Sequence, residues 1–251
     1  MRPCETLEEL AACIDLQKQI WGYPEAEVYP LRLFVNLTKI GGNVLGAFAP
    51  EGRQVGFVAS MPAWRGRRRY YHSLSLGVAA EHENRGVGKT LKRAQRDEAI
   101  RRGLSRIEWT FDPLKAKNAF FNIERLGVIV RRYLPDYYGP VESRLQQGLP
   151  SDRLVAEWWL QSPRVIRALS GERPRVEGKE PAAQVSWTGD IGELAETNPE
   201  RARDVQLALR QRLQDCFRDK LAITGFLRDE RENRYLLDPE TEAELPELDA
   251  P

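Results

Sequence analysis

Residues 79–95 of the chain, "AAEHENRGVGKTLKRAQ", lead from a polar turn directly into a helical pattern. Two glycines flank Val87 where the pattern changes, and at least one of them can take a positive φ angle, which costs an L-residue ~1–2 kcal/mol. The N–H groups at the start of the helix then point outward together and favour a bound anion. An ordinary strand-to-helix turn is the alternative. The residues predicted to bind a phosphate group are Arg85, Gly86, Val87, Gly88, Lys89 and Thr90.

The composition is that of an ordinary soluble globular protein. Of the 251 residues, 41% are hydrophobic and 30% are charged, and the formal net charge is only +1. This balance argues against disorder and against a nucleic-acid partner. The cysteines and histidines show no metal-ligand spacing, so neither a metal site nor a disulfide framework is expected. No apolar run approaches the ~18 residues that a membrane span needs, and we expect a cytoplasmic protein with no membrane partner.

The hydrophobic pattern around the glycine turn predicts a sheet covered by helices. Two helices are expected near the N-terminus, on either side of "GYPEAEVYP". A helix at 87–103, a strand at 105–113, a helix ending at Gly127 and a further strand are expected after the turn. The predicted fold class is α/β (α+β), with a mixed, mostly antiparallel central sheet flanked by helices. Three runs before the turn are typical of strands in an antiparallel meander: residues 42–50, 54–64 and 69–80.

The rest of the chain predicts a C-terminal α/β extension. Residues 153–161 alternate between apolar and polar side chains as a strand that extends the sheet. Residues 170–184 have the glycine, proline and charge content of a linker. Asn198 and the proline after it are typical of a helix start, and residues 220–238 are expected to form a hairpin.

We therefore expect three regions along the chain. A core is expected at residues 1–150, the C-terminal extension at 151–238 and an acidic tail at 239–251. Residues 187–238 have three candidate roles, which are to complete the sheet, to cover an acceptor site or to form the interface of a homodimer.

The stretch "LGVAAEHENRGVGKTLKRAQ", residues 76–95, resembles motif A of the GNAT superfamily of acyl-CoA-dependent N-acyltransferases. It is similar to that family's fourth strand, pyrophosphate loop and third helix. Glu83 stands where the family pattern has Arg or Gln, so one contact of the loop is lost. The resemblance covers residues 5–145. Three further stretches resemble a subgroup associated with N-acylamino acid racemase pathways: "IEWTFDPLKAKNAFFNIERLGV", "RYLPDYYG" and "PSDRLVAEWWL".

The resemblance implies that acetyl-CoA, or another acyl-CoA such as succinyl-CoA, is the co-substrate and that no metal takes part. In the family the pantetheine arm pairs with the backbone of the fourth strand, which corresponds here to Leu76, Gly77 and Val78. Asn118 matches an asparagine that bonds the pantetheine region, with helix capping as the alternative role. The remaining cofactor candidates on this helix are Phe121 and Asn122.

The catalytic residues are less clearly marked. His72, Glu108 and Asp112 are the candidate general bases, and each has a structural alternative: a satisfied histidine in a strand, a solvent-facing strand residue and a turn former, respectively. The tyrosine that serves many GNAT enzymes as general acid is replaced by Ile123. Tyr133 or Tyr138 could substitute for it, with an aromatic-rich strand and turn as the alternative.

The resemblance implies an acyl-CoA-dependent N-acyltransferase that acts on a small-molecule amine, such as an amino acid. The amine attacks the thioester directly, and a proton is delivered to the departing thiolate. An α-amino group has a pKa near ~8, so the demand on a general base is modest. The alternative is a non-catalytic acyl-CoA-binding or regulatory module that kept the phosphate turn.

Overall fold

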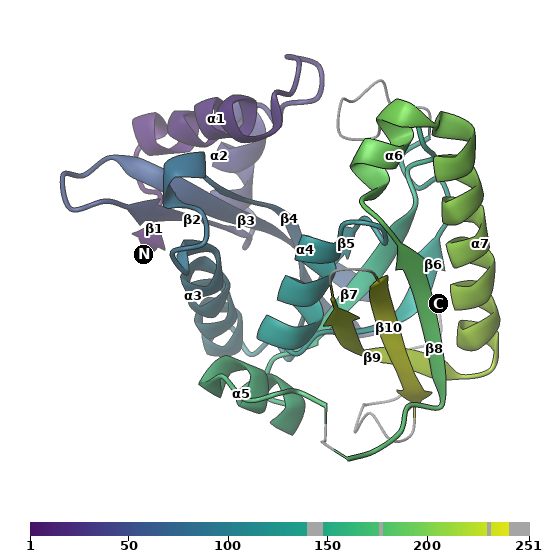
Figure 1. The fold of residues 1–251 in the computed structure, drawn as a ribbon. Helices are drawn as coiled ribbons and strands as arrows, with labels where there is room; N and C mark the ends of the chain where they lie inside the picture. The colour runs from purple at the N-terminus through teal and green to yellow at the C-terminus, as the bar shows by residue number, and fades with distance from the viewer. Residues whose placement is uncertain (140–147, 176–177, 230–231, 241–251) are drawn as a thin grey trace. The chain divides into compact units, whose positions relative to one another are not determined.

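The computed structural model describes residues 1–139, 148–175, 178–229 and 232–240 (Figure 1). The chain divides into two compact units, one formed by residues 1–108 and the other beginning at Trp109. The division falls within strand β5 (Arg106–Phe111). The expected division into a core and an extension near residue 150 stays a prediction. No helix in the described ranges is both long enough and apolar enough to span a bilayer.

The first unit has the elements expected from the hydrophobic pattern. Its strands follow the order β1-β2-β3-β4-β5, and all neighbours are antiparallel except β4 and β5, which are parallel. The predicted meander and the predicted fold class, a mixed and mostly antiparallel sheet, are therefore confirmed. Before β5 the elements are β1 (Arg2–Pro3), α1 (Leu7–Trp21), α2 (Leu31–Lys39), β2 (Asn43–Phe48), β3 (Gln54–Arg65), β4 (Arg68–Val78), the 3₁₀ turn η1 (Ala80–His82) and α3 (Val87–Arg101).

Both faces of this sheet are covered by helices (Figure 1). On one face α1 and α2 pack against β2 and β3, with Phe34 and Phe57 in edge-to-face contact at 5.9 Å between ring centroids. On the other face Leu91 of α3 packs against Leu45 and Val58. Neighbouring residues of a strand point to opposite faces, so β2 and β3 supply side chains to both cores.

Strand β4 carries a bulge that the sequence pattern did not reveal. Ser75 pairs with Ala59 and Ser73 pairs with Ser60, so Leu74 has no partner of its own in β3. An extra residue in one strand shifts the alternation of the residues that follow it. Leu74 packs on the core that contains α1 and α2, whereas Leu76 packs on the core beneath α3. Leu74 and Leu76 therefore face opposite sides of the sheet, although they are two residues apart.

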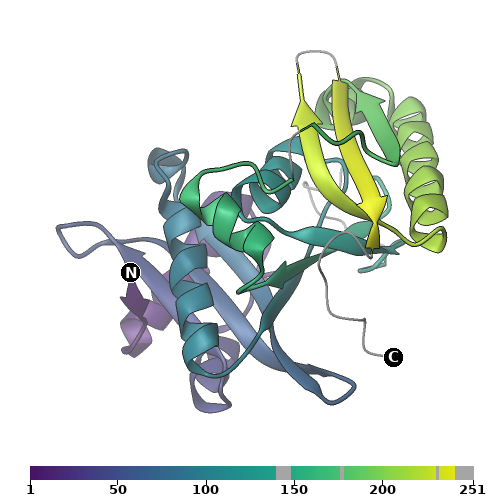
Figure 2. The ribbon, with the colours of Figure 1, turned by 90° about the horizontal axis from the view of Figure 1, so that it is seen from below.

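The second unit contains the C-terminal part of the sheet, in the order β5-β7-β6-β9-β10-β8. The strand expected at 153–161 forms, but it is inserted between β5 and β6 rather than added at an edge. The long hairpin of β9 and β10 is also confirmed (Figures 1 and 2). The elements are α4 (Ala116–Phe120), the π-helical turn η2 (Phe121–Arg125), β6 (Ile129–Leu134), β7 (Arg153–Trp159), α5 (Pro163–Ser170), β8 (Ala183–Thr188), α6 (Ile191–Thr197), α7 (Pro199–Arg218), β9 (Leu221–Arg228) and β10 (Glu232–Pro239).

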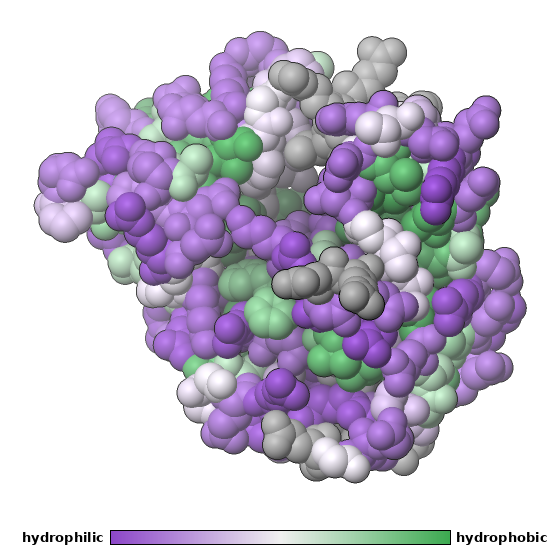
Figure 3. Space-filling model, in the orientation of Figure 1, coloured by the Kyte–Doolittle hydropathy of each residue, from purple (hydrophilic) through white to green (hydrophobic). Residues whose placement is uncertain are grey.

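Helix α7 begins where the sequence predicts. The side chain of Asn198 accepts a hydrogen bond from the N–H of Arg201, and Pro199 occupies the first helical position. The helix buries Leu209 and Leu213, while its outward face is hydrophilic (Figure 3). Three elements were not predicted, namely α5, α6 and β8. The start of α5 did carry a signal, because Ser162 caps that helix and a proline follows it.

Candidate active site

The predicted phosphate turn has the backbone geometry that its glycines suggest. Gly86 has a φ angle of 82° and is the residue immediately before α3. A methyl group added to it would meet no atom within 4 Å, so its conformation, not its surroundings, requires glycine. The N–H of Thr90 donates the first helical bond, to the carbonyl of Gly86 at 3.0 Å. The N–H groups of Val87 and Gly88 precede that bond and have no acceptor within the helix.

The turn follows a strand whose second edge is only partly paired. On one side β4 pairs with β3 as far as Val78. On the other side it pairs with β5 at only two positions, Tyr71 with Ile107 and His72 with Glu108. Among the described strands, none pairs with this edge of β4 from Ser73 to Val78. The backbone of Leu76, Gly77 and Val78 therefore borders an unpaired strand edge, as the resemblance implies.

His72 lies where β4 and β5 separate. It is the last β4 residue that pairs with β5. Burial lowers the pKa of its imidazole, while the carboxylate of Glu108 opposes and the Lys92 ammonium adds to this shift. A depressed pKa keeps His72 neutral near pH 7, which is the form that can accept a proton.

Glu108 is committed to ion pairs. Its carboxylate is 3.1 Å from Nη2 of Arg65 and 3.2 Å from Nε of Arg106. Glu108 and Arg106 are each 1% exposed, and the Arg106 guanidinium stacks 5.0 Å from the ring centroid of Tyr70. Both carboxylate oxygens thus face guanidinium groups, which favours a structural role. The structural alternative, in which Glu108 faces solvent, is wrong. The two arginines offset the free-energy cost of burying its charge.

In the second unit, Tyr133 belongs to a buried network that centres on Asp152. The hydroxyl of Tyr133 donates to Oδ2 of Asp152 at 2.5 Å. Arg210 of α7 donates to both oxygens of the same carboxylate, at 2.9 and 2.7 Å, and the N–H of Asp136 donates to Oδ1 at 2.9 Å. Burial and the bond to Asp152 raise the pKa of Tyr133 well above its ordinary value of 10. Tyr133 is therefore a poor proton donor, and Arg210 is a partner that no sequence signal indicated.

Asp112, Tyr138 and Arg153 form a more open group in the same unit. Oδ1 of Asp112 accepts the N–H of Leu114 at 2.8 Å, and burial raises the pKa of this carboxyl group, while Arg153 opposes the shift. The Tyr138 hydroxyl is 3.1 Å from Oγ1 of Thr110, and the tyrosine is 52% exposed. The Arg153 guanidinium lies 5.0 Å from the Tyr138 ring centroid. Asp112 thus serves as a turn former and still presents a second carboxylate oxygen.

The candidate cofactor residues after β5 differ in their exposure. Asn118 is exposed, and its N–H bonds the carbonyl of Lys115 at 2.9 Å. Asn122 is only 4% exposed. Phe121 lies between these extremes. A π-helical turn begins at Phe121, between the two asparagines. Among the described residues, no three His, Cys, Asp or Glu side chains are grouped so that they could hold a metal ion.

Solved structures with a similar fold include several acetyltransferases or related proteins. The yncA protein of Salmonella typhimurium, determined with its cofactor acetyl-CoA, is 19% identical over 64% of this chain and 93% of its own, with a TM-score of 0.51. A GNAT-family protein of Desulfovibrio desulfuricans is 12% identical over 63% of this chain and 97% of its own, with a TM-score of 0.52. A ribosomal-protein-alanine N-acetyltransferase of Brucella melitensis is 21% identical over 62% and 96%, with a TM-score of 0.50. At these identities the likeness concerns the fold.

None of the curated proteins matches the sequence. The acetyltransferase (GNAT) family model does match, over residues 10–127. This range includes the glycine turn, the unpaired edge of β4 and His72. Residues 10–127 of the chain are therefore similar to the acetyltransferase (GNAT) family.

Proposed function

We propose that the chain transfers an acyl group from an acyl-CoA to the amino group of a small molecule. The observation that carries this proposal is the unpaired edge of β4 from Ser73 to Val78, which leads directly to the open N-terminus of α3. An amide-containing arm can pair with such an edge as an added strand. A diphosphate can then accept bonds from the N–H groups of the turn. The determination of the yncA protein with acetyl-CoA supports the same ligand class.

In the turn from Arg85 to Thr90, backbone N–H groups would contribute most of the binding free energy for the diphosphate, and side-chain charge would contribute the rest. Charge-assisted hydrogen bonds contribute on the order of 1.5–3 kcal/mol each, more than the ~0.3–1 kcal/mol of the helix dipole. Arg85 and Lys89 add formal charge beside these groups, and Arg85 offsets part of the loss at Glu83. Asn118, Phe121 and Asn122 remain candidate contacts to the pantetheine arm, and the exposure of Asn118 favours it over Asn122.

In the proposed reaction the lone pair of a neutral amine attacks the thioester carbonyl carbon, the C–S bond breaks, and the amine loses one proton while the thiolate gains one. His72 is assigned as the base, because it is neutral and lies where β4 and β5 separate. Tyr138 is assigned as the acid, because it is exposed and, among the described residues, its hydroxyl is hydrogen-bonded only to another hydroxyl group. Asp112 is assigned to accept the proton that an incoming ammonium group must lose to become the neutral amine.

The acceptor is proposed to be an amino acid, and acetyl and succinyl groups are both candidate donors. Support for a carboxylate-bearing acceptor comes from Arg153, which approaches both Asp112 and Tyr138. An arginine and an aspartate close together can bind the two charged groups of one amino acid. Membership of the racemase-pathway subgroup, a cytoplasmic location and a homodimer rest on the sequence alone.

Calorimetry with acetyl-CoA and succinyl-CoA, followed by thiol release over a panel of amino acids, tests this function. Gly86→Ala would strain the turn, and Gly103→Ala is the matched control because Gly103 also has a positive φ and open space around it. We expect acyl-CoA affinity to fall at least about tenfold in Gly86→Ala and to stay unchanged in Gly103→Ala. Binding without thiol release would support the non-catalytic module instead. Failure of the wild type to bind any CoA ester would refute both functions.

A further inference from the structure

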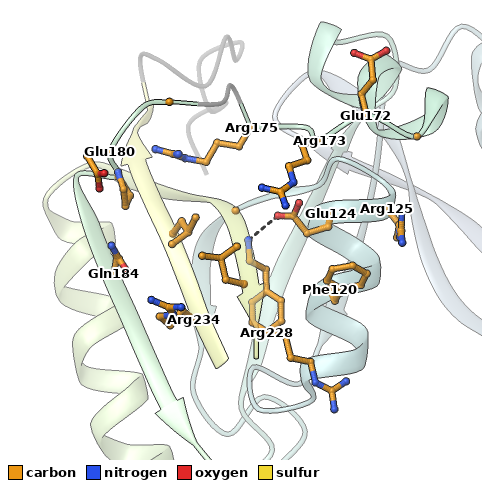
Figure 4. Close-up of a pocket in the computed structure, with 17 residues that line it drawn as sticks. Phe120, Glu124, Arg125, Glu172, Arg173, Arg175, Glu180, Gln184, Arg228 and Arg234 are labelled. Atoms are coloured by element: carbon orange, nitrogen blue, oxygen red, sulfur yellow. Dashed lines mark hydrogen bonds between the residues drawn. The ribbon is translucent and has the colours of Figure 1, made fainter. Parts of the chain in front are cut away.

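The second unit contains a cavity of about 810 Å³ that includes none of the residues assigned to acyl transfer (Figure 4). Its volume lies in the range of small-molecule sites. One wall comes from α4 and η2, another from the chain between α5 and β8, and the floor from β8, β9 and β10. The lining of the cavity includes Phe120, Glu124, Arg125, Gly225, Leu227 and Arg228.

The floor is open because of a glycine. Leu236 of β10 pairs with Gly225 of β9 on one side and with Gln184 of β8 on the other, so the three residues form one row across the sheet. A Cβ atom at Gly225 would lie 3.0 Å from Leu236 and 3.2 Å from Arg175. A side chain at this position would therefore crowd the floor and displace one wall.

Two of the arginines in the lining are structural. Arg175 donates to both oxygens of Asp238, at 2.9 and 3.0 Å, and Arg234 donates to Asp229 at 3.2 Å. Each of these guanidinium groups already has an acidic partner. They shape the walls and contribute little free charge.

Two other arginines of the lining form no ion pair with a carboxylate in the part of the chain that the structure describes. Among the described residues, Arg125 and Arg228 have no carboxylate within 4.0 Å. The Arg125 guanidinium lies 5.2 Å from the ring centroid of Phe120, beside which Figure 4 shows it. Glu124 accepts the N–H of Phe226 at 2.8 Å, and its electrostatic interaction with Arg125 is weaker than those with Arg164 and Arg173.

The same cavity exposes apolar surface. Phe120 is 37% exposed and Leu227 is 38% exposed, and both belong to the lining. Hydrophobic atoms surrounded by hydrophilic ones are visible in the area that β9 and β10 occupy (Figure 3). Apolar surface beside unmatched guanidinium groups is the complement of a molecule with an anionic end and an apolar body.

We propose that this cavity binds an organic anion, in which a phosphate or carboxylate group is attached to a planar apolar body. Arg125, whose guanidinium lies beside Phe120, binds the anionic group through paired N–H donors, and Arg228 adds positive charge to the lining. Phe120 and Leu227 contact the body of the ligand. None of the residues that line the cavity belongs to the proposed cofactor turn.

Calorimetry with phenyl phosphate and with benzoate tests the site, with saturating CoA present to fill any phosphate site at the turn. Phenol and benzyl alcohol are the neutral counterparts of the two probes. The double variant Arg125→Gln/Arg228→Gln removes both unmatched charges. Arg201→Gln/Arg203→Gln is the matched control, because it removes the same charge from the exposed face of α7.

We expect the wild type and the control to bind at least one of the two anions, and the cavity variant to bind it about tenfold more weakly or worse. The preferred probe distinguishes a phosphate site from a carboxylate site. Equal affinity of the wild type and the cavity variant would overturn the proposal. The proposal would also be overturned if neither anion bound more tightly than its neutral counterpart, phenol for phenyl phosphate and benzyl alcohol for benzoate. Failure of both anions to bind at millimolar concentration would overturn it as well.

Discussion

The hydroxyl group of Tyr133 and the carboxylate of Asp152 share a hydrogen bond of 2.5 Å. Arg210 bonds the same carboxylate through two N–H groups. The buried Asp152 carboxylate accepts hydrogen bonds from Tyr133 and Arg210. Removal of either donor would leave this buried charge with fewer hydrogen bonds, so both donors stabilise the fold. The same arrangement holds the tyrosine proton and raises the pKa of Tyr133.

Tyr133→Phe should therefore destabilise the protein without slowing the chemistry. A hydrogen bond to a charged acceptor contributes roughly 1.5–3 kcal/mol, and a loss near the lower end is expected because Arg210 remains. Urea unfolding measures the free-energy change, and thiol release measures kcat. A drop of kcat in Tyr133→Phe with unchanged stability would contradict the structural role and make this tyrosine the acid.

Tyr138→Phe should have the opposite effect. The side chain is half exposed, and Thr110 is the one hydrogen-bond partner of its hydroxyl within the described ranges. Loss of the hydroxyl should therefore change the free energy of unfolding by less than about 1 kcal/mol. A lost general acid typically lowers the rate about 10²-fold or more. Single-turnover thiol release, which isolates the chemical step, is the measurement. Tyr137→Phe is the matched control, because the ring of Tyr137 is also about half exposed. Equal rates for the two variants would exclude Tyr138 as the acid.

The pH dependence of stability should report on His72. Burial depresses the pKa of this histidine in the folded protein, so below about pH 6.5, the ordinary pKa, the unfolded chain binds more protons than the folded one. The stability of the folded state should therefore fall as the pH drops through the interval between pH 6.5 and the depressed value. His72→Gln should remove this component. Urea unfolding of the wild type and of His72→Gln at pH 7.5 and pH 5 gives the loss of stability of each protein. Equal losses in the two proteins would show that His72 is not the group responsible.

The sequence predicted features that depend on neighbouring residues. Gly86 follows Arg85 at a change of hydrophobic period, and such local chemistry sets both the positive φ angle and the start of α3. The capped start of α7 at Asn198 is a second example. Helix α5 shows that local signals can also be overlooked, because Ser162 and the proline after it lie between the strand expected at 153–161 and the linker expected at 170–184.

Features that depend on distant pairing could not be predicted. Nothing within β7 indicates that it inserts between β5 and β6, because the choice of neighbours follows from the packing of the whole sheet. The bulge at Leu74 follows from the register between β3 and β4. Arg210 meets Asp152 across 58 residues of sequence, and an exposed-looking arginine in an amphipathic helix gives no sign of that partner.

The amino group of Lys92 is buried and hydrogen-bonded, so the stability of the protein should depend on its protonation. Its Nζ donates to Oγ of Ser73 at 3.1 Å and to Oε1 of Gln95 at 3.0 Å, and burial lowers the pKa of this lysine well below 10.5. Between the lowered value and 10.5 the unfolded chain binds a proton that the folded chain lacks, so this residue favours unfolding at neutral pH and less so as the pH rises. In Lys92→Met this dependence disappears. The stability of the wild type relative to Lys92→Met should therefore increase from pH 7 to pH 10. Urea unfolding of both proteins at the two pH values measures it, and a pH-independent difference would show that Lys92 keeps its charge in the fold.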